Sequence, residues 1–368
     1  MLIVTACLLA AAGVWYAKHR LDSIETIALD SVLTDQGADA AGATSEFPTE
    51  VENYLIVGSD SRDGASPDDP DYMGIVGTEN HVGRRSDTIM LMRFDPDTNS
   101  AALLSLPRDL YVDIPGSDDP NRINAAYFKG PDVLIKTVTE SLGIPVHHYV
   151  EVDFQGFKRI VDAIDGVSIW FDAPVRDANT GLRVNDTGCV KLDGLQALQY
   201  ARSRHLETKI NGRWREDPTG DLGRISRQQD FIRRAMQKAV ARGSSNPLVL
   251  NELIGAAADN LRIDDQLDLW AFANRLQTLQ GTQIASYTVP ADGKFVKGNA
   301  VLIMNEKAAE PILDYFRGAA SVAASASPAT TQATATAAPT TAAPPAAAAP
   351  PTTARPIGTV PGADKQCN

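Results

Sequence analysis

QYARSRHLETKINGRWREDPTGDLGRISRQQDFIRR, residues 199–234, joins the end of a short predicted helix to a long predicted helix through a polar, glycine-containing loop. Arg202 and Arg204 are two residues apart, and on an extended segment they would point the same way. Arg224 and Gln228 are four residues apart, so they share a face of the long helix. Guanidinium groups bind phosphate bidentately and stay charged. The segment therefore predicts a polyphosphate site.

The segments around this one alternate between strand and helix patterns. Apolar runs predict strands over 53–59, 88–94, 99–107, 148–154, 167–171 and 283–289, and DPDT (95–98) predicts a hairpin turn between the second and third. Helical spacing covers 124–141, 156–164, 193–201 and 251–279, and it is clearest over 224–240. Alternation of this kind is typical of an α/β sandwich, in which helices cover both faces of one sheet.

Composition excludes several classes of protein. The 368 residues are 43% hydrophobic, enough for a sizeable core, and carry a formal net charge of −12. A nucleic-acid-binding protein needs a broad basic face, so this balance predicts no nucleic-acid partner. Three cysteines without a CxxC pair indicate neither a disulfide scaffold nor a zinc site.

The two ends differ from the middle of the chain. Residues 1–17 are uncharged and apolar and end in Trp15 and Tyr16, which predicts an uncleaved transmembrane anchor; a lipoprotein cleavage box at Val4–Cys7 is the alternative. Residues 18–50 are predicted to form a stalk and 51–317 a single catalytic domain. The Ala/Thr/Pro-rich residues 318–368 are predicted to be disordered or extended. We expect a single-pass protein of the cell membrane, monomeric, with its domain outside the cytoplasm.

Two cysteines fall outside the predicted anchor. Cys7 lies within it, which leaves Cys189 and Cys367 on the exported side. Exported cysteines commonly pair, so a Cys189–Cys367 disulfide is expected. Two unpaired or intermolecular thiols are the alternative.

Charged residues also stand at the ends of the predicted strands. Asp60 and Arg62 follow the first strand, Arg85 and Asp87 precede the second, and Arg108 follows the third. Asp221 stands at the start of the long helix. Ligands gather at strand ends in α/β folds, and helix N-termini favour anions. Each of these residues taken alone is better interpreted as a solvated surface charge, and we interpret Arg213 and Arg215 in that way.

Seven motifs occur in one order: VGSDSR, GRRSDTIMLMRFDP, LSLPRDLYVDIPG, RINAAYFKG, GIPVHHYVEVDFQGFKRIVDAIDGV, LDGLQALQYARSR and DPTGDLGRISRQQ. Together they resemble the LytR-CpsA-Psr family over residues 53–242. The resemblance implies a three-layer α-β-α sandwich around a central mixed sheet. It also implies a phosphotransferase that moves a glycopolymer from a polyprenyl diphosphate carrier to a hydroxyl of peptidoglycan or of a cell-wall protein.

The resemblance implies roles for the charged residues. The diphosphate would be bound by Arg62, Arg85, Arg108, Arg202, Arg204, Arg224 and Gln228. Mg²⁺ (or Mn²⁺) would be held by Asp60 and Asp87, and the catalytic set would be Asp60, Asp87, Arg108 and Asp221. A hard cation takes oxygen ligands such as these carboxylates, and one of the two aspartates is the candidate base for the acceptor hydroxyl. The long insertion between Asp60 and Asp87 departs from the family pattern.

Two other functions use the same residues. A phosphohydrolase would cleave a polyprenyl diphosphate with water as the acceptor, and a non-enzymatic protein would bind the cell wall or act as a regulator. A lipid carrier also needs an apolar channel. The candidate lining is Ile89–Leu91, Leu103, Leu104, Val133–Ile135, Ile232 and Met236, for which ordinary core packing is the alternative.

Overall fold

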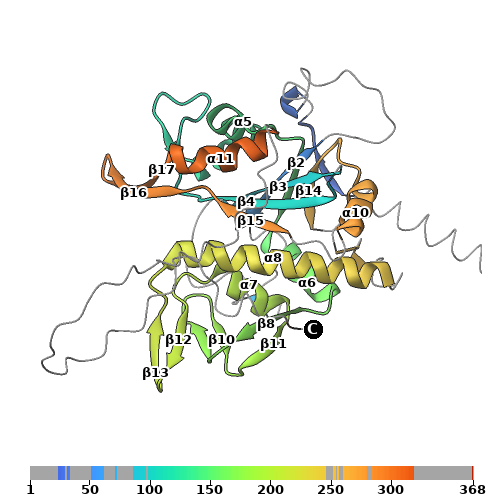
Figure 1. The fold of residues 1–368 in the computed structure, drawn as a ribbon, viewed down its shortest axis with the longest axis vertical. Coiled ribbons are helices and arrows are strands. Elements are labelled where there is room, and N and C mark those ends of the chain that lie inside the picture. Colours follow the sequence, from blue (N-terminus) through green and yellow to red (C-terminus); the bar gives the residue numbers. More distant parts are fainter. Residues whose placement is uncertain are drawn as a thin grey trace, which may run out of the picture.

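The structure is a computed structural model of the chain. It describes residues 24–29, 31–33, 51–61, 71–72, 86–96, 98–245, 252–253, 255–256, 260–279, 284–318 and 367, apart from a few side chains within these ranges. Figure 1 shows a central sheet with helices on both sides and a further layer of small sheets below. The predicted mixed α/β sandwich is confirmed.

The central sheet has seven strands in the order β1-β14-β7-β2-β3-β4-β15. Its bounds are β1 Glu25–Ile27, β2 Glu52–Ser59, β3 Ser86–Asp95, β4 Ser100–Leu106, β7 His148–Val152, β14 Leu261–Asp264 and β15 Ala285–Thr288. Strands β2, β3 and β4 are antiparallel, whereas β7 runs parallel to β2 and β15 runs parallel to β4. The β3–β4 hairpin is confirmed; its turn includes a hydrogen bond from the Thr98 N–H to Asp95 Oδ1 at 3.1 Å.

Helices pack on both faces of this sheet. One face is covered by α4 (Asn124–Lys129), α5 (Pro131–Leu142) and α11 (Glu306–Arg317), and the opposite face by α8 (Gly220–Ser245) and α10 (Leu269–Thr278). Alternate residues of β3 serve the two cores, because successive side chains of a strand point to opposite faces. Leu91 lies in the core under α5 and α11, and Met92 lies in the core next to α8 and α10.

A further layer packs against α8 on its side away from the sheet (Figure 1). It holds α6 (Phe154–Ala163), α7 (Gly194–Arg202), the pair β8 (Val167–Phe171) and β11 (Gly188–Leu192), and a four-stranded sheet. That sheet consists of β10 (Leu182–Val184), β9 (Val175–Asp177), β12 (Glu207–Ile210) and β13 (Arg213–Glu216). The core of the layer includes Ile169, Tyr200 and Phe231. The predicted strand over 167–171 is confirmed as β8, whereas β9 to β13 were not predicted, because they have too few residues for a clear alternation.

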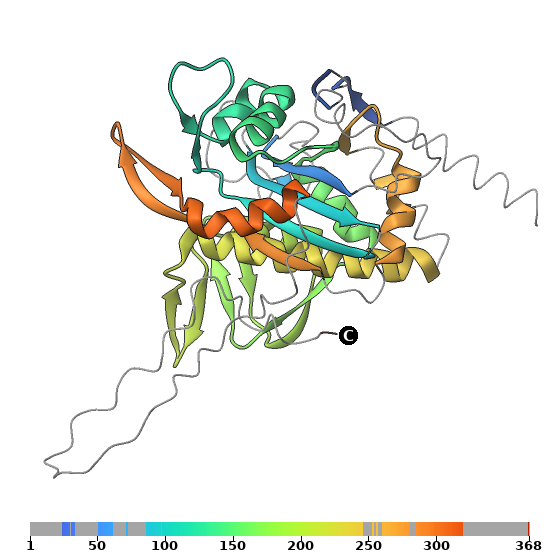
Figure 2. The ribbon, with the colours of Figure 1, turned by 45° about the horizontal axis from the view of Figure 1, so that its top comes forward.

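Two small hairpins complete the described structure. They are formed by β5 (Tyr111–Val112) with β6 (Asn121–Arg122), and by β16 (Ala291–Val296) with β17 (Asn299–Met304). The β16–β17 hairpin extends from the body of the domain (Figure 2).

Several predicted elements differ from the observed ones. The helix predicted over 124–141 is divided at Gly130, whose φ of 132° is outside the helical region, and α5 restarts at Pro131. The helix predicted over 251–279 is interrupted by β14, which pairs with β7 and β1 in the sheet. Arg202 ends helix α7 instead of lying on an extended segment, and the polar loop after it contains the β12–β13 hairpin.

The folded domain begins earlier than the predicted boundary at residue 51. Strand β1 is an edge strand of the central sheet, and Leu29, Val32 and Leu33 are buried in the main core. Part of the predicted stalk (18–50) therefore belongs to the domain, because Glu25–Ile27 pairs with β14, which is distant in sequence. The predicted anchor (1–17) lies outside the described residues. Within the part of the chain that the structure describes, no helix is long and apolar enough to cross a membrane.

The predicted Cys189–Cys367 disulfide is present, with 5.5 Å between the two Cα atoms. Cys189 lies on β11, so the bond attaches the C-terminal end of the chain to the layer beyond α8. Of the predicted tail, only Gly318 and Cys367 are among the described residues.

Candidate functional site

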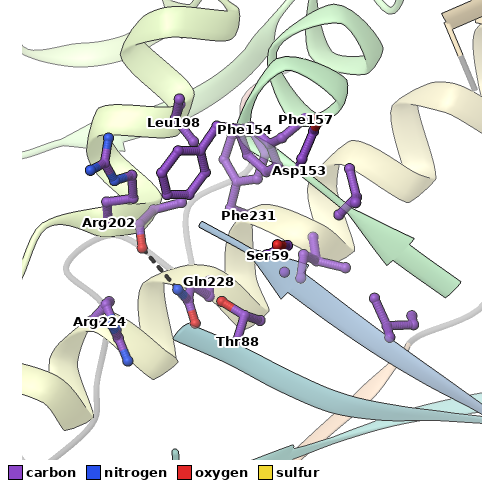
Figure 3. A pocket seen from close by; sticks show the side chains of 15 residues that line it. Ser59, Thr88, Asp153, Phe154, Phe157, Leu198, Arg202, Arg224, Gln228 and Phe231 are labelled. Carbon is purple, nitrogen blue, oxygen red and sulfur yellow. Dashed lines mark hydrogen bonds between the residues drawn. The ribbon is translucent and has the colours of Figure 1, made fainter. Parts of the chain in front are cut away.

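A cavity of about 170 Å³ lies between the ends of β2 and β3 and the helices α6, α7 and α8. Its lining is formed by Ile56, Gly58, Ser59, Thr88, Val152, Asp153, Phe154, Phe157, Leu198, Ala201, Arg202, Arg224, Gln228, Phe231 and Ile232. Figure 3 shows Arg202 beside the ring of Phe154, and Arg224 and Gln228 on the neighbouring helix α8. The cavity therefore has an apolar part and a part lined by nitrogen donors.

Aromatic rings form much of the apolar part. Phe157 of α6 and Phe231 of α8 lie 5.4 Å apart between ring centroids, and Leu198 of α7 packs against Phe154. These side chains meet because α6 and α8 approach the same end of the sheet. Rings and aliphatic groups of this kind favour an apolar ligand segment.

Arg202 lies on the ring of Phe154, with 4.3 Å between the guanidinium carbon and the ring centroid. Phe154 is the first residue of α6, whose N-cap Asp153 accepts a hydrogen bond from the Gly156 N–H at 2.7 Å. Arg202 is in the last turn of α7, where a cation is favoured by the helix dipole. The stacking fixes the plane of the guanidinium group at the cavity wall.

Asp221 holds two of the predicted arginines together. Its Oδ1 lies 3.0 Å from an Nη of Arg224 and 3.2 Å from Nε of Arg204. Arg224 is only 1% exposed, so its charge is desolvated. Asp221 and Arg224 lie in the first turns of α8, where backbone N–H groups and the helix dipole favour anions. This end of the cavity is therefore suited to a phosphate.

Gln228 connects the two helices of the site. It lies one turn beyond Arg224 on α8, and its Nε2 donates to the carbonyl of Ala201 on α7 at 2.9 Å (Figure 3). The side chain also lines the cavity. Its position shows that the fold brings the predicted Arg202, Arg224 and Gln228 to one place.

Arg227 supports the site although the sequence analysis did not select it. Its Nη1 lies 2.9 Å from Asp217, and its Nη2 donates to the carbonyl of Ser203 at 2.5 Å. Burial raises the pKa of Asp217, but hydrogen bonds from Thr219 and the charge of Arg227 outweigh this and lower it. Arg227 is 1% exposed, and its position three residues after Arg224 on one helix was the available signal.

Asp177 fixes the segment between the two site arginines. It accepts hydrogen bonds from the Ser203 hydroxyl at 2.6 Å and from the His205 N–H at 3.1 Å. Burial opposes ionisation of this carboxyl, but these bonds and those from the Asn179 and Thr180 N–H groups lower its pKa. The carboxylate therefore holds residues 203–205 in place, and with them Arg204.

The strand register brings Asp60, Asp87 and Arg108 to the same end of the three neighbouring strands β2, β3 and β4. Ser59, the last residue of β2, pairs with Ser86, the first residue of β3. Asp60 follows Ser59 in the chain, and Asp87 follows Ser86. Leu106 pairs with Ile89, so β4 ends at the same edge just before Arg108. Ser59 and Thr88, the neighbours of the two aspartates, line the cavity.

Arg108 is half-buried at this edge. Its Nε lies 3.5 Å from a carboxylate oxygen of Asp109, and its carbonyl accepts a hydrogen bond from the Asn124 N–H at 3.2 Å. It is not among the residues that line the cavity. Arg62, Arg85 and the side chain of Asp87 lie outside the described residues.

Of the residues predicted to line an apolar channel, one lines the cavity. Ile232 lines the cavity, whereas Ile89, Leu91 and Leu104 belong to the core under α5 and α11. Leu134 and Ile135 lie in that same core, and Leu103 and Met236 belong to the core next to α8 and α10. Except at Ile232, ordinary core packing accounts for these residues.

The two aspartates at the edge of the sheet have the chemistry of a magnesium site. Mg²⁺ commonly binds one or two carboxylates together with substrate phosphate oxygens. Position 60 directly follows β2, and position 87 lies in the neighbouring strand β3. No group of three or more His, Cys, Asp or Glu side chains suited to a metal occurs within the described ranges. Carboxylates at positions 60 and 87 are of the residue type that a two-carboxylate Mg²⁺ site uses.

Comparisons with known proteins agree with this arrangement. The model of the LytR_cpsA_psr family matches residues 29–317. The chain is similar to "Probable cell wall biosynthesis protein LcpB" of Corynebacterium glutamicum, with 34% identity over 315 residues, which are 84% of this chain and 71% of that protein. It is also similar to the "Polyisoprenyl-teichoic acid--peptidoglycan teichoic acid transferase TagU" of Oceanobacillus iheyensis, with 29% identity over 287 residues, 76% of this chain and 78% of the relative.

A solved structure has the same fold. The "LytR-Csp2A-Psr enzyme from Actinomyces oris" superposes with a TM-score of 0.56 at 25% identity, covering 74% of this chain and 92% of that one. The family model spans most of the domain described above, including all the charged positions of the site. The chain therefore belongs to the LytR_cpsA_psr family and, like its TagU relative, it is a transferase.

Proposed function

We propose that this transferase moves a glycopolymer from a polyprenyl diphosphate carrier to a hydroxyl group of the cell wall. The observation that carries the proposal is the cavity in which Arg202, Arg224 and Gln228 stand at one end of an aromatic lining. A ligand that joins a diphosphate to a hydrocarbon chain has the same division into polar and apolar parts. The Oceanobacillus relative is named for a donor and an acceptor of the same kind, a polyisoprenyl-linked polymer and peptidoglycan.

The size of the cavity limits which part of the lipid it holds. Pockets for drug-sized ligands have roughly 300–1,000 Å³, whereas this one has about 170 Å³. It therefore has room for the diphosphate-proximal segment of a polyprenyl chain, and the distal isoprene units must lie beyond it. Phe154, Phe157 and Phe231 would contact that proximal segment.

The reaction replaces a phosphoanhydride bond of the carrier by a phosphoester bond to the acceptor. The acceptor hydroxyl oxygen forms a bond to the phosphorus that carries the glycan, and the bond from that phosphorus to the bridging oxygen breaks. Polyprenyl phosphate leaves with the electron pair. Arg202, Arg204 and Arg224 would donate to the phosphate oxygens and stabilise the charge that develops on the leaving group. Asp221 would act by holding Arg204 and Arg224 in position.

A base must accept the proton of the acceptor hydroxyl, and a carboxylate can act as this base. Asp60 and Asp87 are the candidates, because both positions lie at the edge of the sheet next to the cavity. The same residues would hold Mg²⁺, which when bound supplies charge neutralisation at the diphosphate. Arg108, which follows β4, would contribute a further cation, and Arg62 and Arg85 would contribute two more.

We further propose that the domain works outside the cytoplasm, attached to the cell membrane by residues 1–17, and acts as a monomer. This arrangement would give it access to a carrier in the outer leaflet. The acceptor is peptidoglycan or a cell-wall protein.

One incubation separates transfer from the two alternatives. The full chain in detergent is mixed with a radiolabelled polyprenyl-diphosphate glycan, Mg²⁺ and purified cell-wall acceptor. Label covalently attached to the acceptor supports the proposal, whereas released glycan phosphate alone indicates a phosphohydrolase. No change in the lipid-linked glycan indicates a binding protein. The Arg224→Gln variant should abolish the attachment, and Lys307→Gln, which removes an exposed cation on α11, should not.

A further inference from the structure

A buried chain of hydrogen bonds ends at the β2 side of the candidate site. The Tyr127 hydroxyl of α4 lies 2.9 Å from Oγ of Ser59, the last residue of β2, and 3.0 Å from Oε1 of Glu151 on β7. The Tyr149 hydroxyl donates to the other oxygen of Glu151 at 2.8 Å. All four side chains are buried, and Glu151 is only 3% exposed. The elements α4, β2 and β7 therefore meet at a polar cluster inside the main core.

The hydrogen bonds of this cluster run in one direction. A carboxylate only accepts hydrogen bonds, so the single proton of the Tyr127 hydroxyl is directed to Glu151. The phenol oxygen can then accept the proton of the Ser59 hydroxyl. Ser59 Oγ in turn accepts a hydrogen bond from the Ser61 N–H at 3.1 Å. Glu151 therefore orients the Ser59 hydroxyl through Tyr127, and Ser59 holds the backbone on both sides of Asp60.

The partner strand β3 is irregular at the same place. Gly58 pairs with Thr88, and Ser59 pairs with Ser86. Asp87 is therefore an extra residue of β3, as in a β-bulge, and bulges commonly redirect a side chain beside a functional site. The Ser86 hydroxyl spans the bulge by donating to the Thr88 carbonyl at 2.8 Å. The buried cluster thus fixes the strand end that lies opposite this bulge.

The buried carboxylate of the cluster is costly for the fold. Glu151 is compensated by Arg262, with an Nη–Oε1 distance of 3.4 Å, and Arg262 also pairs with Glu25 at 2.7 Å. Burial and the nearby Glu151 carboxylate raise the pKa of Tyr149, so this hydroxyl keeps its proton and donates. Replacing a buried ionic cluster by apolar side chains is often neutral or stabilising. Stability alone therefore gives little reason for a carboxylate at this place, whereas a fixed end of β2 does.

We propose that Tyr127 and Glu151 are positioning residues of the transferase, which act through Ser59. They hold the ends of β2 and β3, where Asp60 and Asp87 stand, so that the two carboxylates can share one divalent cation. The inference rests on the proposed function, in which these aspartates bind Mg²⁺. Neither Tyr127 nor Glu151 is among the residues that line the cavity, so their effect on the reaction is indirect.

Binding of Mn²⁺ tests this positioning without turnover. The full chain in detergent is titrated with Mn²⁺ in the presence of farnesyl diphosphate, and the electron paramagnetic resonance signal of unbound Mn²⁺ gives the affinity. Substitution of groups that orient metal ligands costs about 10–100-fold in metal affinity. Tyr127→Phe removes a single hydroxyl and should therefore weaken Mn²⁺ binding about tenfold.

Tyr149→Phe is the matched control, because it removes a buried hydroxyl from the same carboxylate. It should lower the melting temperature about as much as Tyr127→Phe does, and its Mn²⁺ affinity should stay within twofold of the natural chain. Ser59→Ala breaks the same connection as Tyr127→Phe. The double variant S59A/Y127F should therefore lose no more affinity than either single variant, since the two substitutions act as one unit.

Several results would overturn the proposal. They are an absence of Mn²⁺ binding by the natural chain, an equal loss of affinity in Tyr149→Phe, and additive losses in S59A/Y127F. Affinity of Tyr127→Phe within twofold of the natural chain would also overturn it. Thermal unfolding curves show whether each variant is folded. Should Tyr127→Phe not fold, Ser59→Ala decides by the same twofold limit.

Transfer assays separate this inference from the proposed function. At low Mg²⁺, Tyr127→Phe should transfer glycan about tenfold more slowly than the natural chain, and excess Mg²⁺ should restore most of the rate. A loss that excess Mg²⁺ leaves unchanged would contradict positioning of the metal ligands. If the natural chain transfers no glycan but Tyr127→Phe still weakens Mn²⁺ binding, the proposed function fails and the inference stands. If it transfers glycan and Mn²⁺ binding is insensitive to Tyr127, the inference fails and the function stands.

Discussion

Substitution of Arg202 by alanine should affect the rate of transfer much more than the stability of the fold. Arg202 stacks on Phe154 at 4.3 Å and lines the cavity at the C-terminal end of α7. Loss of one positioned donor to a transition-state anion costs about 10²–10³ in rate. We therefore expect Arg202→Ala to lower kcat/KM by that factor.

The expected effect on stability is much smaller. A cation–π contact at a partly exposed site contributes about 0.5–1 kcal/mol, and a cation at a helix C-terminus contributes about 0.3–1 kcal/mol. A loss of this size lowers the melting temperature by a few degrees at most. Arg202→Lys keeps the charge but loses the planar fork, so its activity should lie between those of alanine and arginine.

The assay measures labelled glycan attached to cell-wall acceptor over time, with circular dichroism to follow unfolding. Arg159→Ala is the matched control, because Arg159 is an exposed arginine of α6 that does not line the cavity. Arg202→Ala activity within threefold of the natural chain would refute the assignment. So would an equal loss in the Arg159 variant.

Three further outcomes are expected. Asp87→Ala should raise the Mg²⁺ concentration for half-maximal transfer at least tenfold, and a natural chain that works fully in excess chelator would contradict the metal site. Burial, with His148 and Arg93 nearby, lowers the pKa of His147 to about 4. As the pH falls, the imidazole of His147 is therefore protonated in the unfolded chain before it is protonated in the folded chain. The free energy of unfolding is largest above pH 6.5 and decreases as the pH falls toward 4. The free energy of unfolding should drop by about 2 kcal/mol between pH 6.5 and 5, and less in His147→Asn, as measured by urea unfolding. Denatured, unreduced chain should give one titratable thiol, from Cys7, and three after reduction; three before reduction would exclude the disulfide.

The sequence alone predicted much of the central sheet. Strands β2, β3 and β4 have long apolar runs, and the turn between β3 and β4 has a strong local signal. Helices α7 and α8 were predicted near their observed bounds, because Asp193 forms a capping box with Gln196 and α8 has a long amphipathic pattern. Each of these signals depends on residues close together in the chain.

Elements that depend on distant partners were not predicted. Strand β14 lies in a segment with helical spacing, and it is a strand because its backbone pairs with β7 and β1. The short strands β9, β10 and β12 are likewise stabilised by each other. Propensity over three or four residues is too weak to indicate such pairing.

The residue types of the site were readable from the sequence, since arginines, aspartates and a glutamine recur at the ends of predicted elements. The Cys189–Cys367 pairing also followed from the cysteine count and was confirmed. Only the tertiary structure decided which of those residues meet. It brings Arg202, Arg224 and Gln228 to one cavity, leaves Arg108 at the neighbouring edge of the sheet, and adds Arg227 and Asp177 as buried supports. The reason is physical: local sequence sets the chemistry of a side chain, whereas helix packing and strand register set its neighbours.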